Sequence, residues 1–187
     1  MRLVFDTEGN GLLHDTPEAP AITKMHCIVT HDVDTGAVYK FYGDKTVVAD
    51  HGSLQTGLEF IQRADELIGH NIIGYDVPAI RKLFGIDLRK VTLTDTLVLS
   101  KALNADRVLP KGMPSPINPL TGKAERYGPH SLGTWGFRLG RFKPEWHDWK
   151  EFSLGMLHRC AEDVEINVLV YQHLLGELAE IMNKVSA

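Results

Sequence analysis

The sequence predicts one α/β domain over residues 1–187, with a mixed central sheet of about five strands flanked by helices. Two observations favour this class. Three strand-like segments joined by non-helical connections come first, and segments of helical and strand character then alternate along the chain. The length suits a single domain with a substantial apolar core, and the composition is ordinary for a globular protein.

The first part of the chain is predicted to form a β meander. Apolar segments at Leu3 to Asp6, Met25 to His31 and Ala37 to Tyr42 are typical of strands. Asp34-Thr35-Gly36 supplies the residue types of a tight turn between the second and third strands.

Helices and strands alternate in the middle of the chain. Leu54, Leu58 and Ile61 recur at helical spacing, and Pro78 suits the first turn of a second helix. The expected elements, in order, are a helix from Ser53 to about Ala64, a strand from Glu66 to Gly69, a helix from about Val77, a strand from Val91 to Leu93 and a helix around Leu97 to Ala102.

Residues 104–129 form an irregular loop rich in Pro, Gly and basic residues, which is either a substrate-facing flap or a local insertion. From Ser153 a long amphipathic helix is expected, because apolar residues such as Val164, Val168 and Leu175 form stripes along it.

Composition excludes several classes of protein. Only Cys27 and Cys160 are present, which argues against a disulfide framework or a cysteine zinc site. No stretch is apolar enough to span a membrane, and no secretory signal fits before Asp6, so we expect a cytoplasmic protein without a membrane partner. The net charge of −4 disfavours nucleic acid, but basic residues gather in the middle of the chain and permit such a partner.

Asp6 and Glu8 follow the apolar segment Leu3-Val4-Phe5 and precede a glycine-rich turn. Alternate residues of a strand share a face, so the two carboxylates point to one place. Acids at strand ends are often merely solvated or capping groups. Two carboxylates held so close repel unless one is protonated or a cation lies between them, which favours a divalent metal site.

Two further acids complete a candidate cluster. Asp76 follows a polar turn where an α/β sheet collects ligands. It could also be the N-cap of the helix ahead of Val77-Pro78, and both roles can hold at once. Asp163 lies in an otherwise apolar helix beside the stripe of Ala161 and Val164, where a carboxylate needs a partner. Glu162 and Glu165 are the competing acids of this segment and suit solvent-facing positions.

These segments resemble the three motifs of the DEDD 3′ to 5′ exonucleases, which have a ribonuclease H-like fold. The matching segments are Asp6-Thr7-Glu8, Gly69-His70-Asn71 leading to Asp76, and His158 five residues before Asp163. Residues 131–140 are similar to a segment of the proofreading domain of family A phage DNA polymerases.

One position departs from those proofreading domains. They carry Tyr four residues before the last Asp, where this chain has Arg159. The DEDDh subfamily instead places His five residues before that Asp, which His158 matches, with Cys160 in place of a small Ala. The sequence is therefore identified as DEDDh-like.

The resemblance implies two Mg²⁺ or Mn²⁺ ions held by Asp6, Glu8, Asp76 and Asp163, with His158 as the general base. It also implies substrate contacts from Thr7, Leu12, Asn71 and Tyr75, with Leu12 as a wedge between the last two bases. Asp95 is expected to brace the fold. The expected substrate is the 3′ end of single-stranded or frayed DNA, released as 5′-mononucleotides.

Two alternatives stay open at this point. The same fold and residues would suit an enzyme that degrades RNA from its 3′ end. The second alternative is an accessory subunit of a separate DNA polymerase that binds nucleic acid without catalysis, although the intact set of acids argues against it.

Overall fold

Five strands form one mixed sheet in the computed structural model, which describes residues 1–17, 19–43, 51–113, 128–146 and 148–186. The strand order is β3-β2-β1-β4-β5, with antiparallel pairing from β1 to β3 and parallel pairing from β1 through β4 to β5. The strands are β1 (Arg2–Gly9), β2 (Met25–Asp32), β3 (Val38–Tyr42), β4 (Glu66–Gly69) and β5 (Thr92–Asp95). This arrangement confirms the predicted mixed sheet flanked by helices.

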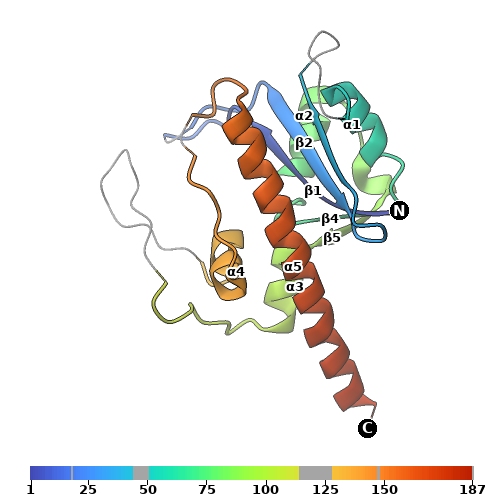
Figure 1. Ribbon diagram of the computed structural model, residues 1–187, viewed down its shortest axis with the longest axis vertical. Helices are drawn as coiled ribbons and strands as arrows, with labels where there is room; N and C mark the ends of the chain where they lie inside the picture. Colours follow the sequence, from blue (N-terminus) through green and yellow to red (C-terminus); the bar gives the residue numbers. More distant parts are fainter. Residues whose placement is uncertain (18, 44–50, 114–127, 147, 187) are drawn as a thin grey trace.

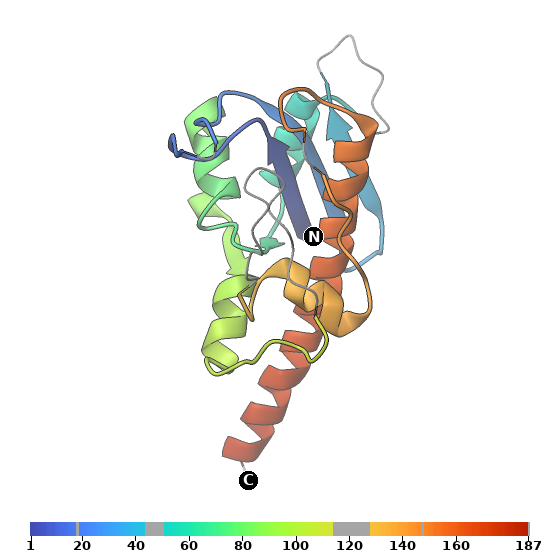
Figure 2. The ribbon, with the colours of Figure 1, turned by 90° about the vertical axis from the view of Figure 1, so that its left-hand side faces the viewer.

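Helices cover both faces of this sheet (Figure 1). One face packs against α1 (Leu54–Ile61) and α2 (Asp76–Phe84), with a short 3₁₀ helix at Leu88–Lys90. The other face is crossed by α5 (Leu154–Val185), and α3 (Thr96–Leu103) and α4 (Leu132–Leu139) pack against α5 in turn (Figure 2).

The central strand β1 divides its side chains between these two layers. Leu3 and Phe5 are buried in the core beneath α1 and α2. Val4 points the other way and is buried against Cys160 and Val164 of α5. Residues two apart on a strand share a face, so Asp6 and Glu8 follow Val4 onto the α5 side.

The predicted elements agree with the structure apart from their ends and one helix. Ser53 and Ser153 are the N-caps of α1 and α5, where their side chains accept hydrogen bonds from Thr56 N and Met156 N. The helix α4 was not predicted, because its eight residues include two glycines. Of the expected loop at 104–129, residues 104–113 and 128–129 contain no helix or strand, and residues 114–127 lie outside the described part.

The last turns of α5 extend beyond the rest of the molecule (Figures 1 and 2). The apolar stripe predicted for this helix continues into these turns, where Leu175, Leu178 and Ile181 are exposed rather than buried. Within the described ranges, no helix is long and apolar enough to cross a membrane.

Asp95 braces the loop that leads to the site, as predicted. Its carboxylate accepts hydrogen bonds from the backbone N–H groups of Asn71 and Ile73 and caps α3 through Leu97 and Val98. The side chain is buried, so each lost acceptor would leave a donor unsatisfied.

We therefore expect Asp95→Ala to lower the free energy of unfolding by about 2 kcal/mol or more, measured by urea denaturation. Asp87→Ala is the matched control, because Asp87 caps the 3₁₀ helix from an exposed position. Its loss should stay below about 1 kcal/mol. Equal losses for the two variants would contradict the bracing role.

Candidate functional site

The carboxylates of Asp6 and Glu8 are presented at the end of β1, where a glycine-rich turn lets the chain fold back closely. A Cβ on Gly11 would lie 2.3 Å from Pro20 O, so only glycine permits this approach. The register of β1 against β2 also shifts between Glu8 and Gly9, which ends the regular pairing just after the second acid. Both acids therefore lie at a fixed strand end facing α5.

Asp76 is held beside β1 by Thr7. The Thr7 backbone N–H donates to Asp76 Oδ1 at 3.1 Å, and the Thr7 hydroxyl donates to the same oxygen at 2.6 Å. Asp76 is 3% exposed and is the first residue of α2, whose N-cap is Tyr75. The possible N-cap role for Asp76 is therefore wrong, because Thr7 supplies the donors to its carboxylate instead.

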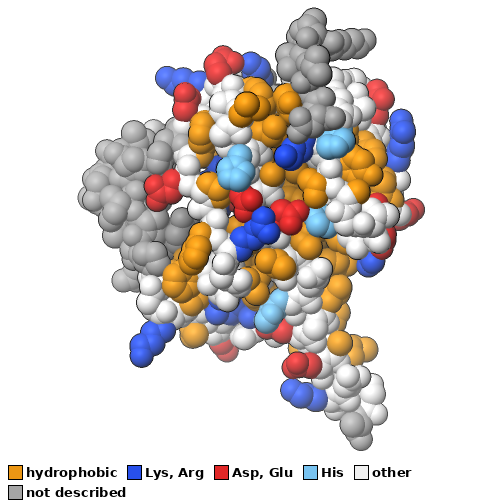
Figure 3. Space-filling view, viewed as in Figure 1, with side chains coloured by type: hydrophobic (Ala, Val, Ile, Leu, Met, Phe, Trp, Pro, Cys, Tyr) orange, Lys and Arg blue, Asp and Glu red, His pale blue; other side chains and the backbone are white. Residues whose placement is uncertain are grey.

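Asp163 is the acid of α5 that lines the pocket described below. Its side chain is 4% exposed, and Lys143 Nζ lies 2.5 Å from its Oδ2. Its other oxygen, Oδ1, is buried without a hydrogen-bond partner in the described part of the chain. Glu162 and Glu165 instead pair with Arg141, and Glu165 also bonds His31 of β2. In Figure 3, basic and acidic side chains lie next to one another near the centre of the viewed face.

The four acids act on one another electrostatically. Burial, followed by the charges of Asp76, Glu8 and Asp163, raises the pKa of Asp6 well above its ordinary value. Burial and the charge of Asp163 raise the pKa of Glu8 to about 8. Burial raises the pKa of Asp76 to about 7, against the hydrogen bonds from Thr7, which lower it. The cluster therefore retains protons near neutral pH unless a cation replaces them.

Cys160 lies directly behind this cluster. Its Sγ is 3.5 Å from both the backbone oxygen and Oδ2 of Asp6, and its thiol can be grouped with the Asp6 and Glu8 carboxylates within 4.8 Å. Burial raises the pKa of the Cys160 thiol well above its usual range, so the thiol stays protonated and is a poor metal ligand. Cys160 is a core residue that supports Asp6.

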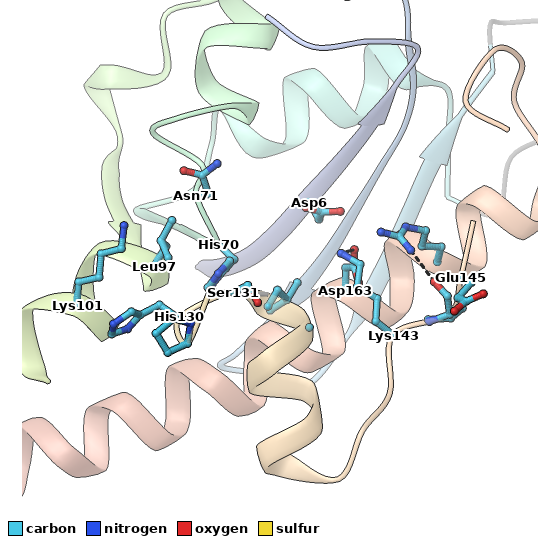
Figure 4. Close-up of a pocket in the computed structure, with 16 residues that line it drawn as sticks. Asp6, His70, Asn71, Leu97, Lys101, His130, Ser131, Lys143, Glu145 and Asp163 are labelled. Carbon is cyan, nitrogen blue, oxygen red and sulfur yellow. Dashed lines mark hydrogen bonds and ion pairs between the residues drawn. The ribbon is translucent and has the colours of Figure 1, made fainter. Parts of the chain in front are cut away.

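A pocket of about 580 Å³ opens in front of Asp6 and Asp163. In Figure 4, Asp6, Asp163 and Lys143 face this space from one side, and His70, Asn71, Lys101 and His130 lie along the other. Basic and hydrogen-bonding groups thus line the pocket together with the carboxylates of Asp6 and Asp163. Such a lining suits an anionic ligand that reaches the acids together with cations.

The structure does not bring His158 to the pocket. Its side chain is exposed, and it is not among the residues that line the cavity, whereas Arg159 is. The reason is helical geometry: α5 begins at Leu154, so residue 158 is already helical and points about 140° away from Asp163, while residue 159 lies one turn before Asp163 on the same face. A base role for His158 has no support from this placement.

The predicted substrate contacts differ in their placement. Asn71 lines the pocket and has a positive φ of 67°. Leu12 is 42% exposed, as a wedge would be, but it does not line the pocket. Thr7 is 3% exposed and bonded to Asp76, and the Tyr75 hydroxyl donates to Gly11 O at 2.6 Å. Thr7 and Tyr75 therefore position the site in this structure.

Sequence reasoning missed the basic residues that lie beside the acids, Lys143 and Arg159. Lys143 lies in a segment without regular periodicity, and nothing in the sequence connects it to Asp163. A signal for Arg159 was present, because a residue four positions before Asp163 on a helix shares its face.

Comparisons with known proteins agree with the fold and with the motifs. No protein-family model matches the chain. The DNA-directed DNA polymerase of Escherichia phage T7 is 30% identical over 206 residues, and that of Enterobacteria phage T3 is 29% identical; both alignments cover 94% of this chain. They cover 27% of each polymerase, so the chain spans about a quarter of these relatives.

A solved structure, Brucella melitensis NrnC with bound Mg²⁺, shares the fold with a TM-score of 0.57 and 16% identity, over 96% of this chain and 74% of that chain. The ribonuclease H-like fold predicted from the motifs is therefore confirmed. The resemblance to phage DNA polymerases is confirmed as well, because the chain is homologous to part of the T7 and T3 enzymes.

The raised pKa of Asp6 predicts how the metal-free protein responds to pH. Asp6 is protonated in the folded state at pH values where the unfolded chain, with a carboxyl pKa of about 4, has lost its proton. The folded state then binds more protons, so stability falls as pH rises through this window. Asp6→Asn removes the titrating group.

With a chelator present, Asp6→Asn should gain thermal stability relative to the wild type between about pH 5 and about pH 8, by roughly 3 °C or more. Differential scanning fluorimetry measures this. Asp106→Asn, at an exposed position, is the control and should follow the wild type at every pH. A pH-independent difference for Asp6→Asn would show that the acids are not coupled.

Proposed function

We propose that this chain is a metal-dependent 3′ to 5′ exonuclease, which hydrolyses terminal phosphodiesters of single-stranded or frayed DNA to 5′-mononucleotides. One observation carries the proposal. Asp6 and Glu8 of β1, Asp76 of α2 and Asp163 of α5 interact electrostatically as one cluster, in a chain homologous to phage DNA polymerases. Asp76 and Asp163 are buried, and Asp6 and Glu8 are partly exposed. A cluster of this kind costs stability and serves no structural purpose without cations.

The residues of the cluster fit hard divalent cations. Their donors are carboxylate oxygens, and Asp163 Oδ1 is buried without a partner among the described residues. Asp6, Glu8, Asp76 and Asp163 would therefore hold Mg²⁺ or Mn²⁺, two ions in the mechanism that we propose. Such ions, when bound, supply activation of a water nucleophile and neutralisation of charge on the phosphate.

The rest of the site derives from the chain's own side chains. Thr7 fixes the orientation of Asp76 through two hydrogen bonds, and Cys160 and the core behind it fix Asp6. Lys143 offsets the charge of Asp163, so the cluster is less repulsive toward an approaching phosphate. Asn71, which also lines the pocket, would contact the terminal nucleotide, and exposed Leu12 would be the wedge.

DNA is the substrate that the relatives favour, because both are DNA-directed DNA polymerases. We further propose that the ends it acts on are those made by a separate DNA polymerase, with proofreading as the biological role. RNA is the principal competitor as a substrate, since the cluster itself engages a phosphate and does not distinguish the two sugars.

Removal of a carboxylate should abolish hydrolysis without unfolding the protein. We expect Asp6→Ala and Asp163→Ala to lose at least about a thousandfold in rate on 5′-labelled single-stranded DNA with Mg²⁺ or Mn²⁺, because both remove a metal ligand. Circular dichroism and thermal melting check the fold. Asp106→Ala, at an exposed position outside the pocket lining, should retain full activity.

The same assay decides substrate and polarity. We expect the 5′-labelled strand to be shortened from its 3′ end, faster for DNA than for RNA of the same sequence. Chelator should prevent this shortening. If RNA is degraded faster than DNA, RNA and not DNA is the preferred substrate. Binding of oligonucleotides by folded wild type without any shortening would refute the enzyme assignment and favour an accessory role.

The DEDDh assignment depends on His158, and its placement gives a distinct expectation. Because the imidazole is exposed and lies outside the pocket lining, His158→Ala should change turnover by less than about twofold and leave the pH–rate profile unaltered. Steady-state rates over a range of pH measure this. A loss of about a hundredfold or more would instead show that the segment rearranges and that His158 is the base.

A further inference from the structure

Arg159, and not His158, lines the pocket from α5. It lies one helical turn before Asp163 on α5, and its Nε is 3.7 Å from Glu8 Oε1. Its side chain is 16% exposed, so the guanidinium is largely withdrawn from solvent yet borders the cavity. It is therefore a fixed positive charge next to the carboxylate cluster.

The guanidinium is held in place from behind. Its Cζ lies 5.2 Å from the centroid of the Trp149 ring, a cation–π contact, and its Nη1 donates to Pro144 O at 2.5 Å. Both partners belong to the segment between α4 and α5. These contacts restrict the side chain to one position before any ligand arrives, which reduces the entropy lost on binding.

Arg159 does not have the geometry of a structural ion pair. In this chain, Arg107 binds Glu177 through two hydrogen bonds of 3.0 and 2.7 Å, and Arg141 binds Glu162 through two of 2.9 and 3.1 Å. The 3.7 Å separation from Glu8 is too long for a hydrogen bond. Arg159 Nε is buried without a hydrogen-bond acceptor in the described part of the chain.

A buried guanidinium N–H without an acceptor is costly, and an acceptor supplied by a ligand removes that cost. Phosphate oxygens match the planar donor set of arginine well. The adjacent acids would hold cations at the same place, so the anion that arrives there is the phosphodiester of the substrate. Arginine stays protonated at all relevant pH values and cannot act as a base.

We infer that Arg159 binds a non-bridging oxygen of the terminal phosphodiester. The inference rests on the proposed exonuclease function and adds to it a substrate-binding residue at the position where the related proofreading domains carry tyrosine. Arg159 thereby supplies charge stabilisation on the phosphate from the α5 side of the pocket that His70 and Asn71 also line.

The test is a binding cycle without metal, so that it does not depend on turnover. Fluorescence anisotropy in chelator and at fixed salt measures the dissociation constant of a short single-stranded DNA. Two forms of the DNA are compared, one unmodified and one with a neutral methylphosphonate at its 3′-terminal phosphodiester. The proteins are wild type, Arg159→Gln and, as matched control, Arg141→Gln, whose arginine pairs with Glu162 and Glu165 outside the pocket lining.

We expect Arg159→Gln to weaken binding of the unmodified DNA about tenfold and the methylphosphonate to weaken wild-type binding by a similar factor. The methylphosphonate should therefore cause little further loss of affinity in the Arg159→Gln protein, because both changes remove the same contact. Arg141→Gln should show the full methylphosphonate penalty. The inference would be overturned if Arg159→Gln bound the unmodified DNA as tightly as the wild type does. It would also be overturned if the methylphosphonate weakened binding to Arg159→Gln by the same factor as binding to the wild type.

Arg159→Lys keeps the experiment decisive if Arg159→Gln does not fold. Lysine retains the charge but not the planar donor set, so its methylphosphonate penalty should be smaller than that of the wild type. An equal penalty would overturn the inference. These outcomes are separate from those of the proposed function, because a chain that never shortens DNA with Mg²⁺ or Mn²⁺ refutes the exonuclease even if Arg159 contacts the phosphate.

Discussion

The repulsion among four clustered carboxylates, of which Asp76 and Asp163 are buried, is the constraint that the rest of the structure has to withstand. Asp6, Glu8, Asp76 and Asp163 come from one strand and two helices, and their mutual charges and burial hold protons on the cluster near neutral pH. Such an arrangement persists only because the surrounding fold is fixed independently of it. The core on both faces of β1, with Phe5 on one side and Val4 on the other, supplies that independence.

Two basic side chains moderate this repulsion without removing it. Lys143 neutralises one oxygen of Asp163, and Arg159 approaches Glu8 without bonding to it. Complete neutralisation by well-paired arginines would leave nothing for a cation to bind. If the proposed function holds, the Asp163 oxygen that has no partner among the described residues would be open to cations, and Arg159, at its long separation from Glu8, would be open to an anionic substrate.

Local patterns were enough to predict the layout of the sheet, but each acid had a competing interpretation, and only the resemblance to the DEDD exonucleases joined the four into one predicted site. The strands are apolar segments bounded by turn residues, and Asp163 borders an apolar stripe where a charge needs a partner. Asp76 kept two possible roles, because its partner Thr7 is 69 residues away and no local pattern reveals that bond. Lys143 and α4 were missed for the same reason: long-range packing, rather than propensity, places them.

His158 and Arg159 show why motif spacing alone is a weak guide to a side chain's direction. A His five residues before an Asp reaches the same site only if the intervening backbone departs from a regular helix. Here Ser153 caps α5 five residues before His158, so the helix is fully formed through both positions and the 100° step per residue selects Arg159. The cap, not the identity of the histidine, decides which side chain faces the acids. The chemistry on that wall of the pocket is consequently set by a permanent cation.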